Sequence, residues 1–222
     1  MIYREWFVNF RFPGHEEVPM VDSQLGQIPE GWRVSRLGDV LELCYGRALK
    51  EADRRGGHIP VFGSSGVVGY HDEALATGPG IIVGRKGNVG SVHWSDSDFY
   101  AIDTVYFVKT DLPLHYVFYN LQSQNFINSD AAVPGLSRAQ AYSLQFLVAS
   151  QPIMELFADY AVGLFAAISN LRHRNKNFHE TRELLLPRLM SGEIDVSDLD
   201  IHGLETITDV NRSAETAEVK QP

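Results

Sequence analysis

The chain has 222 residues, of which 44% are hydrophobic and 21% are charged, a balance that is ordinary for a globular protein with a sizeable core. No uninterrupted apolar run approaches the ~18 residues of a membrane helix, and the first residues lack the apolar centre of a signal peptide. The single cysteine, Cys44, excludes a disulfide framework and a cysteine-based zinc site. We therefore expect a cytoplasmic protein that does not enter a membrane.

The net charge of −9 is unfavourable for a nucleic-acid partner, but this charge lies at the two ends of the sequence. Residues 193–222 contain eight acidic and two basic residues, and residues 1–30 contain five acidic and two basic residues. The stretch between them, 31–192, contains 15 of each. The middle of the chain can therefore gather basic side chains on one face without opposing a net negative charge of its own.

The first two thirds of the chain predict a short helix followed by many short strands. Aromatic residues at helical spacing predict a helix within residues 1–12, which Pro13-Gly14 ends. Prolines and glycines then predict a linker over 15–31. Strands are predicted at 40–44, 59–62, 81–83, 91–94 and 104–108, with dense glycines at the turns between them, and a short helix is predicted at 114–123.

A long helix follows, in which apolar residues recur every seven positions. Phe157, Leu164, Leu171, Phe178 and Leu185 occupy heptad position a. A helix over 153–186 would be ~50 Å long, which exceeds what a compact domain of ~120 residues can cover. We therefore expect a coiled coil with a partner helix, and the alternative is a helix lying across its own domain. The predicted pairing residues are Ile153, Phe157, Tyr160, Leu164, Leu171, Phe178 and Leu185.

Signatures of catalysis are absent from the sequence. There is no phosphate-binding G-x-x-x-x-G-K-[ST] loop, and no pair of histidines has the four-residue spacing of a helical zinc site. Gly78-Pro79-Gly80 lacks the third glycine of a dinucleotide fingerprint, and Gly63-Ser64-Ser65-Gly66 lacks the last glycine of a nucleophile elbow. We therefore expect no catalytic residue, no metal and no cofactor.

Basic residues in glycine-rich loops are the better candidates for function. Arg85 and Lys86 stand between Gly84 and Gly87, where the small residues let the backbone approach a partner, and Asn88 adds a further donor. The alternative is that these are ordinary solvated loop charges. The full set of predicted DNA-binding residues is Arg47, Lys50, Arg54, Arg55, Ser64, Ser65, Arg85, Lys86, Asn88, Ser137 and Arg138.

Five segments, in order, resemble the specificity (S) subunit of type I restriction–modification systems. They are IPEGW at 28–32 with RLGDV at 36–40, GRKGNVG at 84–90, AIDT at 101–104, AVPGLS at 132–137, and RELLLPRLMSG at 182–192. The sequence SQPIME at 150–155 departs from the Pro-Pro-x-x-x-Gln start of the family's conserved helix, which leaves the N-terminal contacts of that helix open.

The resemblance implies an α/β (mixed α+β) fold, in which a target recognition domain with a curved mixed sheet is carried on a long C-terminal coiled-coil helix. Its domains would be a remnant of a conserved-region helix at 1–14, a linker at 15–31, the target recognition domain at 32–150, the conserved spacer and dimerisation helix at 151–190, and an acidic, disordered tail at 191–222.

The resemblance also implies a function without chemistry. The chain would read one half of a split double-stranded DNA target and would dock a methyltransferase (M) subunit and a restriction, or motor (R), subunit. Because most S subunits contain two recognition domains and this chain contains one, it is similar to a half-S subunit. Such a half would pair with an identical chain or with a complementary half-S subunit through the long helix.

Two alternatives come from other classes of protein. The chain could be a decoy or interaction fragment that binds the partner subunits through its helix without reading DNA. It could also be a small nuclease, although the sequence lacks the clustered acidic residues with a nearby lysine that such a site needs.

Overall fold

The computed structural model describes residues 2–126 and 135–195. It comprises two units, residues 1–169 and residues 170–222, which we describe separately. The first unit contains the sheets and the hydrophobic core. The described part of the second contains the continuation of the last helix, α5 (Gln151–Met190).

The chain begins with helix α1 (Ile2–Phe7), as the aromatic spacing predicts. Tyr3, Trp6 and Phe7 lie three or four residues apart, so they share one face of the helix, and all three are buried. The first residues of the chain are therefore part of the core of the first unit.

Residues 15–31, for which we expected a linker, contain η1 (His15–Glu17) and a hairpin of β1 (Met20–Ser23) and β2 (Gly26–Pro29). Gly26 has a φ of 90° at the turn, and the hydroxyl of Ser23 donates to its carbonyl oxygen at 2.6 Å. This local turn chemistry closes the hairpin.

The principal sheet is antiparallel and has four strands in the order β4–β10–β7–β8. Its strands are β4 (Glu42–Tyr45), β7 (Gly80–Gly84), β8 (Val92–Ser95) and β10 (Val105–Lys109). Every residue of β7 is buried, which explains its uninterrupted apolar sequence. All four strands were predicted to within two residues at each end.

Two smaller sheets complete the mixed architecture. In one, β5 pairs antiparallel with β6 and parallel with β9, and in the other β3 pairs antiparallel with β11. Their bounds are β3 (Arg33–Arg36), β5 (Ile59–Gly63), β6 (Gly66–His71), β9 (Tyr100–Ala101) and β11 (Gln145–Val148). Of these five, only β5 was predicted.

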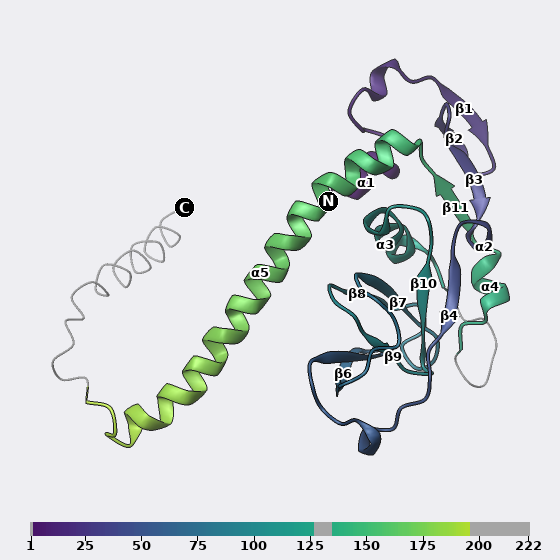
Figure 1. Cartoon of the computed structure of the whole chain (residues 1–222). Helices are drawn as coiled ribbons and strands as arrows, with labels where there is room; N and C mark the ends of the chain where they lie inside the picture. The colour runs from purple at the N-terminus through teal and green to yellow at the C-terminus, as the bar shows by residue number, and fades with distance from the viewer. Residues whose placement is uncertain (1, 127–134, 196–222) are drawn as a thin grey trace, which may run out of the picture. The chain divides into compact units, whose positions relative to one another are not determined.

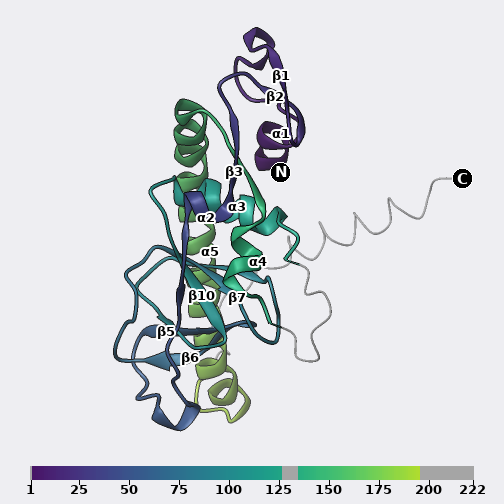
Figure 2. The same ribbon diagram turned by 90° about the vertical axis from the view of Figure 1, so that its right-hand side faces the viewer.

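Helices cover the principal sheet on one side. Helix α3 (Leu114–Ser123) lies against β7 and β8, and the first turns of α5 pack on α3 (Figures 1 and 2). Phe165 of α5 contacts Phe118 of α3 with ring centroids 5.7 Å apart. Short helices α2 (Leu37–Val40), η2 (Glu51–Asp53) and α4 (Arg138–Tyr142) connect the strands.

The first turns of α5 belong to the core of the first unit. Met154, Phe157 and Ala161 are buried, and the Phe157 ring lies 5.1 Å from that of Phe7 and 6.0 Å from that of Tyr119. Ile153 also packs against this core. Ile153 and Phe157, two of the predicted pairing residues, thus pack in their own domain, because α1 supplies an aromatic surface that the heptad pattern could not reveal. A third, Tyr160, keeps an exposed side chain but contacts Trp6 of α1 at a ring-centroid distance of 5.7 Å.

The other predicted pairing residues are exposed. Their exposed fractions are 55% for Tyr160, 53% for Leu164, 61% for Leu171, 65% for Phe178 and 41% for Leu185. Five large apolar side chains at heptad spacing form a stripe of the kind that soluble proteins normally cover. The predicted acidic tail, 191–222, lies outside the described residues from 196 onward.

By length and composition alone, α5 contains an 18-residue window that is apolar enough to cross a membrane, with a mean hydropathy of 1.4. Its first turns nevertheless bury Met154, Phe157 and Ala161 within a folded domain and expose Glu155 and Asp159. Charged side chains at such positions are costly in lipid, so we interpret the apolar residues of α5 as protein-packing surface.

Candidate nucleic-acid interface

The loop that follows β7 presents the paired cations at one edge of the principal sheet. The backbone N–H groups of Arg85 and Lys86 both donate to the carbonyl oxygen of Thr104, at 2.9 and 3.0 Å. A Cβ on Gly84 would lie 2.1 Å from the carbonyl oxygen of Asn88, and Gly87 has a φ of 76°. The glycines around the cations are therefore required by a tightly folded loop.

A second turn, between β5 and β6, lies against this loop. The Ser64 hydroxyl accepts from the Asn88 N–H at 3.3 Å, and the Ser91 hydroxyl donates to the Ser64 carbonyl at 2.6 Å. The His93 ring contacts the same carbonyl through Nε2 at 3.0 Å. Ser64 and Asn88, both predicted site residues, are thus neighbours, and the adjacent Ser65 is exposed.

The segment that leads into α4 brings Arg138 to the same region. The Leu136 N–H donates to the Arg85 carbonyl at 2.8 Å, and Nη1 of Arg138 lies 3.4 Å from the Leu43 carbonyl. Ser137 caps α4, because its hydroxyl accepts from the Gln140 N–H at 3.1 Å. Of the matching family segment 132–137, residues 132–134 lie outside the described residues.

Tyr45 joins the two arginines, and sequence reasoning missed it. The guanidinium carbon of Arg138 lies 4.4 Å from the centre of the Tyr45 ring, and that of Arg85 lies 5.0 Å from it. These distances fall within the range of cation–π attraction. The contact arises from strand pairing and loop packing, for which no local sequence pattern exists.

Tyr106 of β10 pairs with Tyr45 of β4 and connects this region to the principal sheet. Burial raises the pKa of Tyr106, and the neighbouring Tyr45 raises it further. The hydroxyl is therefore protonated at neutral pH, and it donates to the Leu136 carbonyl at 2.9 Å. This bond ties the segment before α4 to the principal sheet.

One carboxylate lies among the cations. Nζ of Lys86 is 3.7 Å from a carboxylate oxygen of Asp103, and Nη1 of Arg85 donates to the Asp103 backbone carbonyl at 3.1 Å. The Lys86 and Asp103 side chains are both half exposed, and such an ion pair contributes about 0–1 kcal/mol. Lys86 can exchange this partner for a phosphate at little cost.

The second predicted basic cluster divides into tied and exposed members. Nη1 of Arg54 donates to the Val68 carbonyl at 2.6 Å, and Arg55 forms ion pairs with Asp72 at 2.8 Å and Glu73 at 2.7 Å. Arg47 and Lys50 are exposed and make no ion pair within the part of the chain that the structure describes. The structure therefore makes Arg47 and Lys50 more available to an anionic partner than Arg54 and Arg55.

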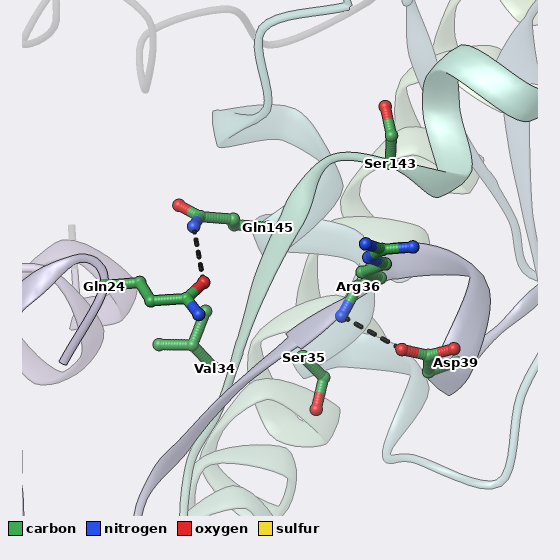
Figure 3. A pocket seen from close by; sticks show the side chains of 7 residues that line it. All are labelled: Gln24, Val34, Ser35, Arg36, Asp39, Ser143 and Gln145. Carbon is green, nitrogen blue, oxygen red and sulfur yellow. Dashed lines mark hydrogen bonds between the residues drawn. The ribbon is translucent and has the colours of Figure 1, made fainter.

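A polar pocket of about 470 Å³ lies elsewhere, between the hairpin turn and the β3–β11 pair (Figure 3). Its lining residues are Gln24, Val34, Ser35, Arg36, Asp39, Ser143 and Gln145. Gln145 donates to Gln24 at 3.2 Å, and the Arg36 N–H donates to Asp39 at 3.3 Å. The pocket contains no predicted site residue, and its charged side chains are exposed.

Residues 2–126 and 135–195 contain no cluster of three or more histidine, cysteine, aspartate or glutamate side chains suited to a metal ion. The region around the loop after β7 instead offers hydrogen-bond donors. Backbone-anchored Arg85, Lys86, Asn88, Ser64 and Arg138 converge there. Such a set can bind phosphate oxygens and the acceptor groups of base edges.

Comparison with known proteins identifies the domain. Residues 29–140 match the family described as the type I restriction modification DNA specificity domain. The chain is 23% identical over 226 aligned positions to the type I restriction enzyme MjaIX specificity subunit of Methanocaldococcus jannaschii, covering 89% of this chain and 52% of that protein. It thus spans about half the length of this curated relative.

A solved structure supports the predicted fold class. The crystal structure of a type I restriction–modification S subunit from M. genitalium matches with a TM-score of 0.62 at 16% identity, over 72% of this chain and 46% of that one. The HsdS subunit from Thermoanaerobacter tengcongensis matches with a TM-score of 0.44 at 13% identity, over 78% and 48%. With the family match covering half of its residues, the chain belongs to the type I restriction–modification DNA specificity domain family.

Proposed function

We propose that this chain is a non-catalytic specificity protein that reads one half of a split double-stranded DNA target in a type I restriction–modification complex. The observation that carries the proposal is the convergence of Arg85, Lys86, Asn88, Ser64 and Arg138 at one edge of a domain that belongs to a DNA specificity family. Membership of that family supports a role in recognition rather than in catalysis.

The relative's name, a specificity subunit of a restriction enzyme, suggests which partners to test. We propose docking to an M subunit and to an R subunit, in the cytoplasm. The chemistry and the cofactors of methylation and cleavage would then belong to those subunits, and this chain would need no cofactor of its own.

Within the site, we assign different tasks to the two adjacent cations. Arg85 is held by a backbone carbonyl and by aromatic rings, so its remaining donors have a defined direction that suits a base edge in the major groove. Lys86 has a half-exposed side chain whose ammonium group forms one ion pair, at 3.7 Å, and it suits a phosphate.

Substitution of either cation by alanine tests this assignment in the complex with the M subunit. Arg85→Ala is expected to weaken binding to the specific target by about 1–3 kcal/mol. Lys86→Ala is expected to weaken binding to all sequences alike and to reduce the slope of log K against log salt by about 1. Fluorescence anisotropy titrations at several salt concentrations measure both quantities.

Lys109→Ala is the matched control, because Lys109 is exposed at the opposite end of β10 from the loop. Its affinity and salt slope should equal those of the wild type. Wild-type affinity in both Arg85→Ala and Lys86→Ala would show that the loop after β7 does not contact DNA.

The isolated chain is expected to bind DNA weakly. Residues 31–192 have no net charge and the two ends are acidic, so long-range attraction to a polyanion is small. We expect micromolar or weaker binding of the free chain at physiological salt, measured by anisotropy, and tighter binding once the M subunit is added. Nanomolar binding of the free chain would show that the partner is not needed.

We further propose that the exposed stripe of α5 pairs with an identical chain or with a complementary half-S subunit. An apolar groove of about 250 Å³ adjoins the stripe within the first unit, and its lining is Ile2, Tyr3, Tyr119, Phe157, Tyr160, Ala161 and Leu164. Two identical antiparallel helices would be related by a two-fold axis. The preferred DNA would then be an interrupted palindrome, with one half for each recognition domain.

A further inference from the structure

Tyr45 lies where the loop after β7 and the segment before α4 meet. It is the last residue of β4, 48% exposed, and its ring centre is 5.2 Å from that of Tyr106, its partner across the strand pair.

Two guanidinium groups share this one ring. The guanidinium carbon of Arg138 is 4.4 Å from the ring centre and that of Arg85 is 5.0 Å from it. The two positive charges repel one another, and the attraction of each guanidinium to the electron-rich phenol ring offsets part of that repulsion. Replacing the ring by an aliphatic side chain would leave the repulsion without this compensation.

Each arginine is also held at a second point that leaves donors available. Nη1 of Arg85 donates to the Asp103 carbonyl at 3.1 Å, and Nη1 of Arg138 approaches the Leu43 carbonyl at 3.4 Å. The guanidinium carbon of Arg85 also lies 5.7 Å from the centre of the Tyr106 ring. A guanidinium has five N–H donors, so one bond to a carbonyl together with ring contacts fixes its direction while most donors remain free. Arginine oriented in this way suits the O6 and N7 acceptors of guanine.

We propose that Tyr45 is a positioning residue of the DNA interface, which orders Arg85 and Arg138 as a pair of donors and thereby sets discrimination at a guanine-containing step of the half-target. The proposal rests on the proposed DNA-reading function of the same site. It assigns the effect to the aromatic ring, because the ring is the part of Tyr45 that both guanidinium groups approach.

The variants separate the ring from the hydroxyl and from general surface effects. Tyr45→Phe keeps the ring, and Tyr45→Leu removes it while retaining an apolar side chain at the end of β4. Tyr70→Leu is the matched control, because Tyr70 is 49% exposed at β6 and makes no cation–π contact within the described residues. Thermal unfolding of all three variants verifies that they fold.

The first measurement needs no DNA. Nuclear magnetic relaxation of the guanidinium Nε–H groups in the free chain reports how rigidly Arg85 and Arg138 are held. We expect rigid side chains in the wild type, Tyr45→Phe and Tyr70→Leu, and mobile ones in Tyr45→Leu. Unchanged rigidity in Tyr45→Leu would overturn the positioning role, whatever the DNA result.

The second measurement uses the complex with the M subunit. The wild-type complex first enriches a parent sequence from a random pool of duplexes, and a library is then made that contains every single-base variant of this parent. Tyr45→Leu should lose about tenfold in affinity for the parent sequence and should tolerate replacement of guanine at one or two positions. Tyr45→Phe and Tyr70→Leu should behave as the wild type does. Unaltered discrimination by Tyr45→Leu would overturn the inference alone, whereas a wild-type complex that enriches no sequence would overturn the proposed function and this inference with it.

Discussion

Glutamate at both Leu164 and Leu171 is expected to convert a self-associated chain into a monomer whose recognition domain stays folded. Both leucines are more than half exposed, and neither belongs to the hydrophobic core. Burying one leucine contributes about 1.5–3 kcal/mol, and a two-fold pair would lose four of them and gain four charges at the contact. A loss of this size abolishes association in the micromolar range. Sedimentation across micromolar concentrations measures the change.

The double variant Ala166→Glu with His173→Glu is the matched control. It has the same spacing and introduces the same two glutamates per chain, but its positions are exposed and lie off the heptad stripe. It should associate like the wild type. If the wild-type chain sediments as a monomer at all these concentrations while α5 remains helical by circular dichroism, the proposed pairing is wrong.

Phe157→Ala is expected to lower the free energy of unfolding of the first unit by about 3–5 kcal/mol. Phe157 is 3% exposed, and its ring contacts those of Tyr3, Trp6 and Phe7 at centroid distances of 5.1–5.9 Å. Removing it leaves a cavity among aromatic rings. Urea denaturation in the Leu164→Glu, Leu171→Glu background measures the effect without a contribution from association.

Phe178→Ala is the control in the same background, because Phe178 is 65% exposed and has the same heptad position. We expect its free energy of unfolding to change by less than about 0.5 kcal/mol. Equal, small effects of the two substitutions would mean that α5 does not pack on its own domain in solution.

Elements with a strong local pattern of apolar residues could be predicted from the sequence. The uninterrupted apolar run of β7 and the helical spacing of α3 and α5 belong to this group. Strands β3 and β11 do not, because they pair with each other across more than 100 positions of the chain. Such pairing depends on where the rest of the domain places the two segments.

Some features of the candidate site could likewise be predicted from the sequence, and others could not. Glycines around Arg85 and Lys86 mark a tight loop in the sequence, and the structure places such a loop there. Arg55 looks equally available in the sequence, yet the carboxylates of Asp72 and Glu73, which directly follow β6, form ion pairs with it. Tyr45 could not be found, because its contacts with Arg85 and Arg138 join three segments that are distant in the sequence.

The heptad stripe shows the same limit within one helix. Phe157 and Leu164 are indistinguishable by position and hydrophobicity, but one is buried in the core and the other is exposed. The difference comes from α1, whose aromatic face meets the helix only at its first turns. A periodic pattern specifies which residues seek a partner, and the tertiary structure determines which partner each one finds.

Selection of duplexes from a random-sequence pool, by the chain in complex with the M subunit of its own system, tests the central claim of DNA reading most directly. We predict enrichment of a short sequence that recurs as two halves at a fixed separation, and loss of defined bases from that sequence when Arg85 is replaced by alanine. A pool that shows no enriched sequence, or the same sequence from the wild type and Arg85→Ala, would contradict the account and would favour a protein that binds its partner subunits without reading DNA.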